Sequence, residues 1–97
     1  MKALPPIPEE IQVPAGPIPV TRTVGLWDAD RSMGKFNWFE RTIELESELG
    51  VHAAWLTLEH ERVHAIISDS GIDVGSEELE EQICNAVALA RVAEMFR

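Results

Sequence analysis

All six prolines of this 97-residue chain lie within its first 19 residues. Proline has no amide hydrogen to donate, and it biases the residue before it towards extended backbone. We therefore expect residues 1–19 to form an extended Pro-rich arm with little secondary structure, and residues 20–97 to form the folded domain. The arm is either a mobile tail or docked across a cleft of that domain, with Ile7, Ile11 and Val13 supplying apolar contacts.

Two stretches of the domain have the pattern of β-strands. Residues 20–26 are rich in β-branched side chains, which favour strands. Residues 41–46 alternate apolar Ile43 and Leu45 with polar side chains, which is typical of a strand with one wet face. Residues 28–35, between the two stretches, have the composition of a turn.

The rest of the chain predicts two helices. The first spans about residues 52–69 and ends near Gly71, and the second runs from Ser76 to about residue 95. Ser76 is a good N-cap residue, and Glu77 and Glu78 suit the positive end of the helix dipole. The expected fold is therefore α+β: a short antiparallel sheet of two or three strands packed on two helices.

Charge and composition exclude several classes of function. The formal net charge of −9 repels nucleic-acid phosphates, so we expect no nucleic-acid partner. No apolar run approaches the roughly 20 residues that span a bilayer, and the N-terminus has no secretory h-region. A single cysteine excludes an internal disulfide, which favours a reducing, cytoplasmic compartment. The oligomeric state stays open.

The first predicted helix contains His60-Glu61-Arg62-Val63-His64, which fits the pattern HExxH. Positions four apart lie on one face of a helix, one turn apart, so both imidazoles can bind one zinc ion while Glu61 sits beside it. The alternative is a pair of core histidines satisfied by hydrogen bonds. Both fall within the apolar stripe of the helix, and burying two imidazoles needs a reason.

A catalytic zinc ion needs a third protein ligand and an open position. On a helical wheel of the second helix, Glu81 lies among small apolar residues, whereas Glu80 lies on a charged side. We expect Glu81 to be the third ligand, with Glu80 as the alternative. Asn85, one turn beyond Glu81, is expected to hydrogen-bond to a ligand histidine. Cys84 is expected to be a small buried apolar residue, although its thiolate could reach the metal in a blocked state.

The stretches LTLEHERVHAI and EEQICNAVA resemble the small gluzincin-type zinc metallopeptidases, including compact phage-associated forms and the ImmA/IrrE-like group. In that family HExxH pairs with a glutamate on the next helix, often followed four residues later by Asp or Asn. The resemblance implies a minimal zincin-like domain with His60, His64 and Glu81 as zinc ligands. It also implies that residues 41–46 are an edge strand that holds an extended peptide substrate.

The implied activity is hydrolysis of peptide bonds by zinc-activated water, with Glu61 as the general base. Such enzymes also stabilise the oxyanion with a Tyr, His or Arg, and this chain has no tyrosine. That role would fall to His52 or to one of Arg22, Arg31 and Arg41. The alternative function is a non-catalytic, zinc-stabilised protein-interaction module on the same scaffold.

Overall fold

Alternating apolar residues build a four-stranded sheet within residues 4–95, the part of the chain that the computed structural model describes. The strands are β1 (Glu10–Val13), β2 (Gly16–Thr23), β3 (Gly34–Asn37) and β4 (Thr42–Glu46), in the order β1-β2-β4-β3. The pair β2–β4 is parallel and the other two pairs are antiparallel. The α+β class is confirmed. The sheet is mixed and has at least one strand more than expected.

Residues 10–19, which were expected to belong to the arm, form β1 and the first half of β2. Pro17 and Pro19 pair opposite Gln12 and Glu10. The amide of Val20 donates to the carbonyl of Glu9 at 2.8 Å, so hydrogen-bonded pairs alternate with the proline positions. The missing amide hydrogens therefore lie on the side away from β1, where a strand tolerates proline. The expected unstructured arm is not confirmed for these residues, and residues 1–3 lie outside the described part.

The segment before β1 is docked on the fold. The indole Nε1 of Trp55 donates to the carbonyl of Pro5 at 2.6 Å, and Ile7 packs against the hydrophobic core. Both contacts fix residues 5–7 along the first turns of the long helix that follows the sheet.

The expected strand over 20–26 ends at Thr23, and a short helix α1 (Leu26–Asp30) follows it. The predicted turn over 28–35 is therefore occupied by part of α1 and the start of β3. Glu46 of β4 explains the helix, because its carboxylate accepts the amide of Trp27 at 2.8 Å and the amide of Glu48 at 3.2 Å. The bond to the Trp27 amide is the main reason that the pKa of Glu46 is lowered from 4.5.

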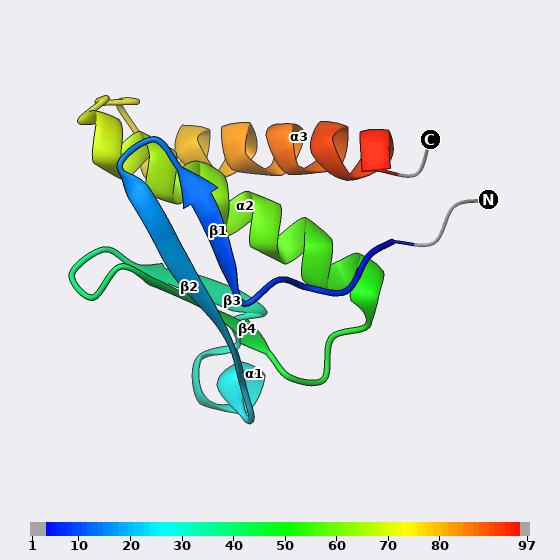
Figure 1. The fold of residues 1–97 in the computed structure, drawn as a ribbon. Coiled ribbons are helices and arrows are strands. Elements are labelled where there is room, and N and C mark those ends of the chain that lie inside the picture. The colour runs from blue at the N-terminus through cyan, green and yellow to red at the C-terminus, as the bar shows by residue number, and fades with distance from the viewer. Residues whose placement is uncertain (1–3, 96–97) are drawn as a thin grey trace.

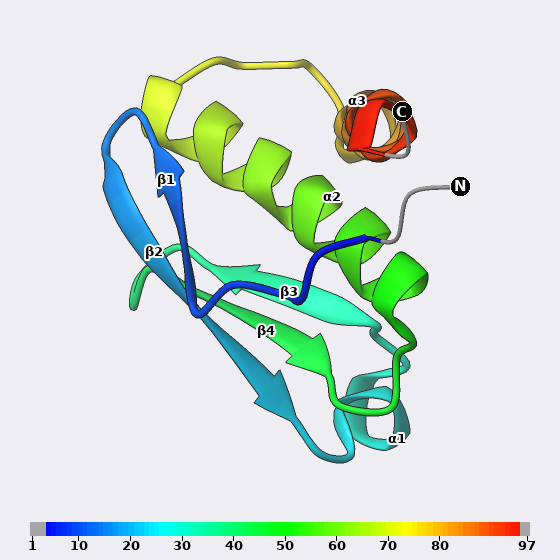
Figure 2. The same cartoon turned by 45° about the vertical axis from the view of Figure 1, so that its right-hand side comes forward.

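The two predicted helices are confirmed as α2 (Val51–Ser70) and α3 (Glu77–Met95). Gly71 ends α2 in the left-handed region at φ 67°, and the Ser76 hydroxyl accepts the amide of Leu79 at 3.1 Å at the start of α3. Figures 1 and 2 show that α2 crosses one face of the sheet and that α3 lies on the far side of α2.

The hydrophobic core lies between the sheet and α2. Its buried members come from β1, β2, β4 and α2: Ile11, Val13, Ile18, Val20, Ile43, Leu45, Ala54, Leu58 and Ala65. Among residues 4–95, no helix has both the length and the apolar content of a membrane-spanning segment.

β3 approaches α2 closely at Gly34. A Cβ atom added there would lie 2.5 Å from the Thr57 methyl group and 3.0 Å from the carbonyl oxygen of Glu44. The absence of a side chain thus allows the edge strand to lie directly beside the middle of α2, which places β3 over the helix that carries HExxH.

We expect Gly34→Ala to lower the free energy of unfolding by about 1–3 kcal/mol, because the added methyl overpacks the β3–α2 contact. Chemical denaturation measures this change. Gly50→Ser is the control, since a Cβ there meets nothing within 4 Å and serine is favourable at an N-cap. Equal stability of the Gly34→Ala variant and the parent would show that β3 does not need this close approach.

We expect Glu46→Gln to lower the melting temperature at pH 7. The pKa of Glu46 is lower in the folded than in the unfolded state, so its stabilisation is present above pH 4.5 and is lost as pH falls through the folded value. The difference between parent and variant should therefore shrink below pH 4.5. A pH-independent difference, or the same trend in the exposed control Glu40→Gln, would contradict this assignment.

Candidate metal centre

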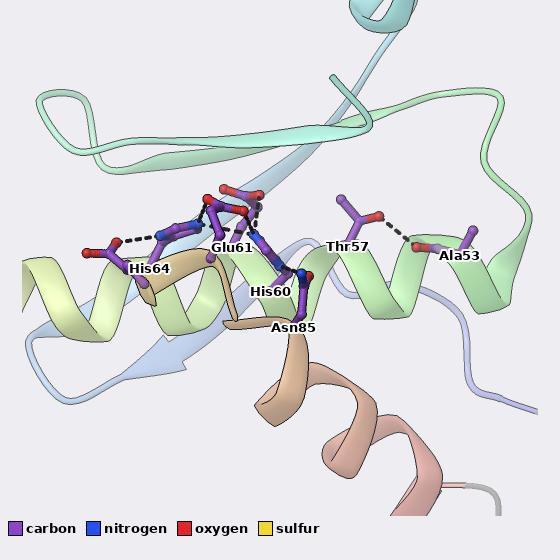
Figure 3. A network of polar contacts seen from close by, with 8 residues as sticks. Ala53, Thr57, His60, Glu61, His64 and Asn85 are labelled. Atoms are coloured by element: carbon purple, nitrogen blue, oxygen red, sulfur yellow. Dashed lines mark hydrogen bonds and ion pairs between the residues drawn. The ribbon is translucent and has the colours of Figure 1, made fainter. Parts of the chain in front are cut away.

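Helix α2 places two imidazoles side by side. His60 and His64 lie four residues apart, and their Nε2 atoms are 3.1 Å from each other. Figure 3 shows both rings on the side of α2 that faces the β3 edge and α3, with Glu61 beside them. Both side chains are largely buried. The predicted proximity of the two histidines is therefore present in the fold.

Side chains of α3 hold the outward-facing nitrogen of each ring. His60 Nδ1 lies 2.7 Å from Asn85 Oδ1, and His64 Nδ1 lies 2.6 Å from Glu80 Oε2. Amide and carboxylate oxygens accept hydrogen bonds, so each Nδ1 carries the hydrogen. In the neutral rings both Nε2 atoms are then left with lone pairs that face each other. Partners that fix the tautomer in this way are typical of metal-ligating histidines.

Glu81 brings a carboxylate to the same point from α3. One of its oxygens lies 2.9 Å from His60 Nε2, and the other lies 2.7 Å from His64 Nε2. Glu80, the alternative ligand, instead binds the outer nitrogen of His64. Among the glutamates of α3 that sequence reasoning weighed as the third ligand, the structure therefore places Glu81 at the convergence point and Glu80 behind it.

The donor set fits a small divalent cation. Two imidazole lone pairs and a carboxylate repel one another at 2.7–3.1 Å unless a proton or a cation lies between them. A tetrahedral zinc ion with bonds of about 2.0–2.1 Å holds its ligand atoms roughly 3.3 Å apart. The two Nε2 atoms and the two Glu81 oxygens need to move by only a few tenths of an ångström for the imidazoles and the carboxylate to reach that spacing.

Negative charge dominates the cluster. Burial by itself lowers the pKa of His64, but the hydrogen bond to Glu80 and the charges of Glu61 and Glu81 outweigh burial, so that the pKa is raised. The same environment that favours a proton on His64 also favours a metal cation in its place.

Cys84 is a further candidate ligand. Its Sγ and the ring nitrogens of His60 and His64 lie within 4.8 Å of one another, and its side chain is fully buried. Burial, followed by the charges of Glu80 and Glu81, raises the pKa of the thiol to about 12. Glu81 is in direct contact with both rings, so Glu81 is the better third ligand and Cys84 is the next candidate.

Glu61 lies between α2 and β3. Its Oε2 is 4.0 Å from His60 Nε2, and the backbone amide of Phe36 donates a hydrogen bond to its carboxylate. Burial raises the pKa of Glu61, and this effect exceeds the lowering by the two histidines. The Glu61 carboxylate thus lies beside the convergence point and has a raised pKa, and the described interactions include no direct contact between it and His64. Such a carboxylate is suited to exchange protons.

These groups lie along the floor of a cleft of about 960 Å³. One wall is β3 and the turn after it, and the other wall is the connection between α2 and α3 together with the first turns of α3. Beyond the metal site, the residues that line the cleft include Gly34, Phe36, Trp38, Ile67, Ile72, Val74, Asp73 and Glu77. None of residues 4–19 lines the cleft, so the docked N-terminal segment does not cross it.

The strand over 41–46, expected to be an edge strand, lies inside the sheet. β4 pairs with β2 on one side and with β3 on the other, so it has no free edge for a peptide. The edge beside the cleft belongs to β3. The backbone amide of Glu46 donates to the carbonyl of Met33, and hydrogen-bonded positions alternate along an antiparallel pair. The backbone groups of Lys35 and Asn37 therefore bond to β4, whereas those of Gly34 and Phe36 face the open edge.

The basic residues considered for oxyanion stabilisation lie elsewhere. Arg22 donates to three carbonyls near the end of β4, and Arg41 pairs with Asp69. Arg31 lies over the ring of Trp27. Neither these residues nor His52 is among the described residues that line the cleft. The sequence did not predict β3 itself. The aromatic residues Phe36, Trp38 and Phe39, just before the predicted strand, were a signal for it.

Comparisons of the chain with protein-family models, with curated proteins and with solved structures found no match.

We expect Glu81→Gln to weaken zinc binding by more than about tenfold, and Asn85→Leu to weaken it by about 10–100-fold through loss of the hydrogen bond that orients His60. Competition with a chromophoric chelator measures both affinities. Glu94→Gln, the same chemical change in the last turn of α3, is the control. Unchanged affinity of the Glu81→Gln variant would place the third ligand elsewhere, with Cys84 as the next candidate.

Proposed function

We propose that this chain is a zinc-dependent peptidase. The observation that carries the proposal is the convergence of three acceptors, His60 Nε2, His64 Nε2 and Glu81, on the floor of a cleft that has a free strand edge. Two histidines of an HExxH motif and a glutamate from the next helix are also the ligand set of the gluzincin-type metallopeptidases that the sequence resembles.

In this proposal His60, His64 and Glu81 hold the zinc ion, and Asn85 and Glu80 orient the imidazoles. Bound zinc supplies a Lewis acid that lowers the pKa of water towards 7 and polarises a carbonyl group. Glu61 takes a proton from the attacking water and delivers it to the leaving amine. Its raised pKa suits this exchange, because a general base works best with a pKa nearer the operating pH.

β3 is the part of the cleft that suits an extended peptide. Its free edge presents the backbone groups of Gly34 and the carbonyl of Phe36, and a substrate strand added there gains main-chain hydrogen bonds. Such a strand runs directly past Glu61, which is bonded to the amide of Phe36. The proposed substrate is therefore a peptide or an unfolded protein segment. We propose that turnover is slow or restricted to few partners, because the cleft offers little to stabilise the oxyanion. Among the described cleft residues, Lys35 is the one Lys or Arg side chain.

A second function has its own support. In the described part of α3 the buried side chains are Cys84, Ala88 and Val92, none of them larger than valine. An ion held by His60 and Glu81 would link the two helices, as in metal-stabilised modules that bind other proteins. Either function suits a reducing compartment such as the cytoplasm, because Cys84 is a free thiol.

Glu61→Gln separates the two functions. We expect the variant to keep one zinc ion per chain and the melting temperature of the parent, and to lose peptide cleavage by about 10²–10⁴-fold, because the general base is removed. Elemental analysis, thermal unfolding and cleavage of a fluorogenic casein measure the three quantities.

The matched control is Glu78→Gln, an exposed glutamate of α3 that does not line the cleft. Cleavage that survives Glu61→Gln would contradict the mechanism. A zinc-loaded parent that cleaves nothing, and unfolds at a lower temperature after chelation, would favour the interaction module.

A further inference from the structure

An exposed aromatic side chain borders the cleft beyond the metal site. Trp38 is 70% exposed and lines the cleft, and it follows β3 directly. Phe39, the next residue, is 82% exposed, but it is not among the described residues that line the cleft. The two rings are in an edge-to-face contact with centroids 5.8 Å apart. Large exposed aromatic groups beside a cleft are typical of binding sites.

The turn that carries Trp38 is held in place. The side-chain oxygen of Asn37 accepts the amides of Phe39 and Glu40, each at 3.0 Å. Arg41 has φ 54°, in the left-handed region, and its guanidinium pairs with Asp69 of α2. A non-glycine residue in that region is strained, and the Asp69 pair and the sheet offset this strain. The backbone that carries Trp38 is thus held in place, so that no loop has to be ordered when a ligand binds.

Apolar residues also line the cleft from the helical side. Ile67 belongs to the last turns of α2, and Ile72 and Val74 belong to the connection between α2 and α3. Ile72 is exposed. Together with Trp38 they give the cleft an apolar part beside the metal site.

The rest of this wall is acidic. Asp73 and Glu77 are exposed and line the cleft, and they are distinct from the glutamates that contact the imidazoles. Lys35, on the opposite wall, has its ammonium group 3.7 Å from Glu44. With a net charge of −9, the molecule attracts cationic segments towards this wall.

We propose that the cleft selects extended peptides in which a bulky apolar side chain lies next to lysine or arginine. The apolar side chain packs on Trp38 in the apolar part of the cleft, and the basic residues face Asp73 and Glu77. Trp38 is thereby a specificity-determining residue. This inference rests on the proposed function, since it places the peptide along the free edge of β3.

Fluorescence anisotropy on the zinc-loaded Glu61→Gln chain tests the proposal without cleavage. The probes are three short fluorescein-labelled peptides: one with a central phenylalanine between lysines, one with serine in its place, and one with glutamates in place of the lysines. We expect the first to bind at least about tenfold tighter than the other two. Adding Trp38→Ala should abolish the preference for phenylalanine, whereas Phe39→Ala, which removes the neighbouring exposed ring, should leave it intact.

Equal affinity of the three peptides, equal losses in the two aromatic variants, or binding of none of the peptides would overturn the proposal. Because Trp38 is exposed, its replacement should leave the melting temperature unchanged, and this is measured alongside. Failure of the peptidase proposal gives a different result: the zinc-loaded parent leaves the phenylalanine peptide intact although its binding depends on Trp38.

Discussion

Two imidazole lone pairs that face each other across 3.1 Å are the constraint on which the site depends. Asn85 and Glu80 bind the outer nitrogens of His60 and His64, so the rings cannot turn their lone pairs away without losing those bonds. A carboxylate from Glu81 adds a third acceptor at the same point. A cation converts this repulsion into attraction, and it ties α3 to α2 at the same time. In the proposed metal centre, metal affinity and the docking of α3 would therefore be one linked equilibrium.

The sheet contributes the other half of the cleft. Gly34 lets β3 lie against α2 at Thr57, and the amide of Phe36 then reaches Glu61. The two turns at the end of β3 and of α2 are joined by the Arg41–Asp69 pair. A residue with no side chain, a backbone amide and one ion pair thus position the strand edge, the proposed general base and Trp38 relative to the histidines.

Local patterns in the sequence predicted the helices and β4 well. Ser76 caps the start of α3, and Gly71 ends α2 in the left-handed region. The alternation of Ile43 and Leu45 with polar residues marks the buried face of β4. The HExxH spacing likewise depends on one helix, whereas the helical wheel of α3 pointed to Glu81 on an apolar face, and Glu81 is in fact more exposed than Glu80. The helix ends, β4 and the HExxH spacing could be predicted because each is decided by residues within a few positions along the chain.

The remainder depends on long-range pairing. Pro17 and Pro19 indicated an arm, yet they fit β2 because their nitrogens lie on the side away from β1. α1 begins where Glu46, almost twenty positions away, accepts the amide of Trp27. The choice between β3 and β4 as the edge strand depends on the parallel β2–β4 pair. The exposure of Trp38 likewise depends on the capped turn after β3 and is not decided by its neighbours in sequence alone.

X-ray absorption at the zinc edge of the zinc-loaded full chain tests the central claim most directly. We expect one ion per chain surrounded by nitrogen and oxygen atoms at about 2.0–2.1 Å, with two imidazole contributions and no sulfur. A sulfur contribution at about 2.3 Å would make Cys84, and not Glu81, the third ligand. A chain that takes up no zinc, or a spectrum without imidazole contributions, would contradict the claim that this cluster is a metal centre.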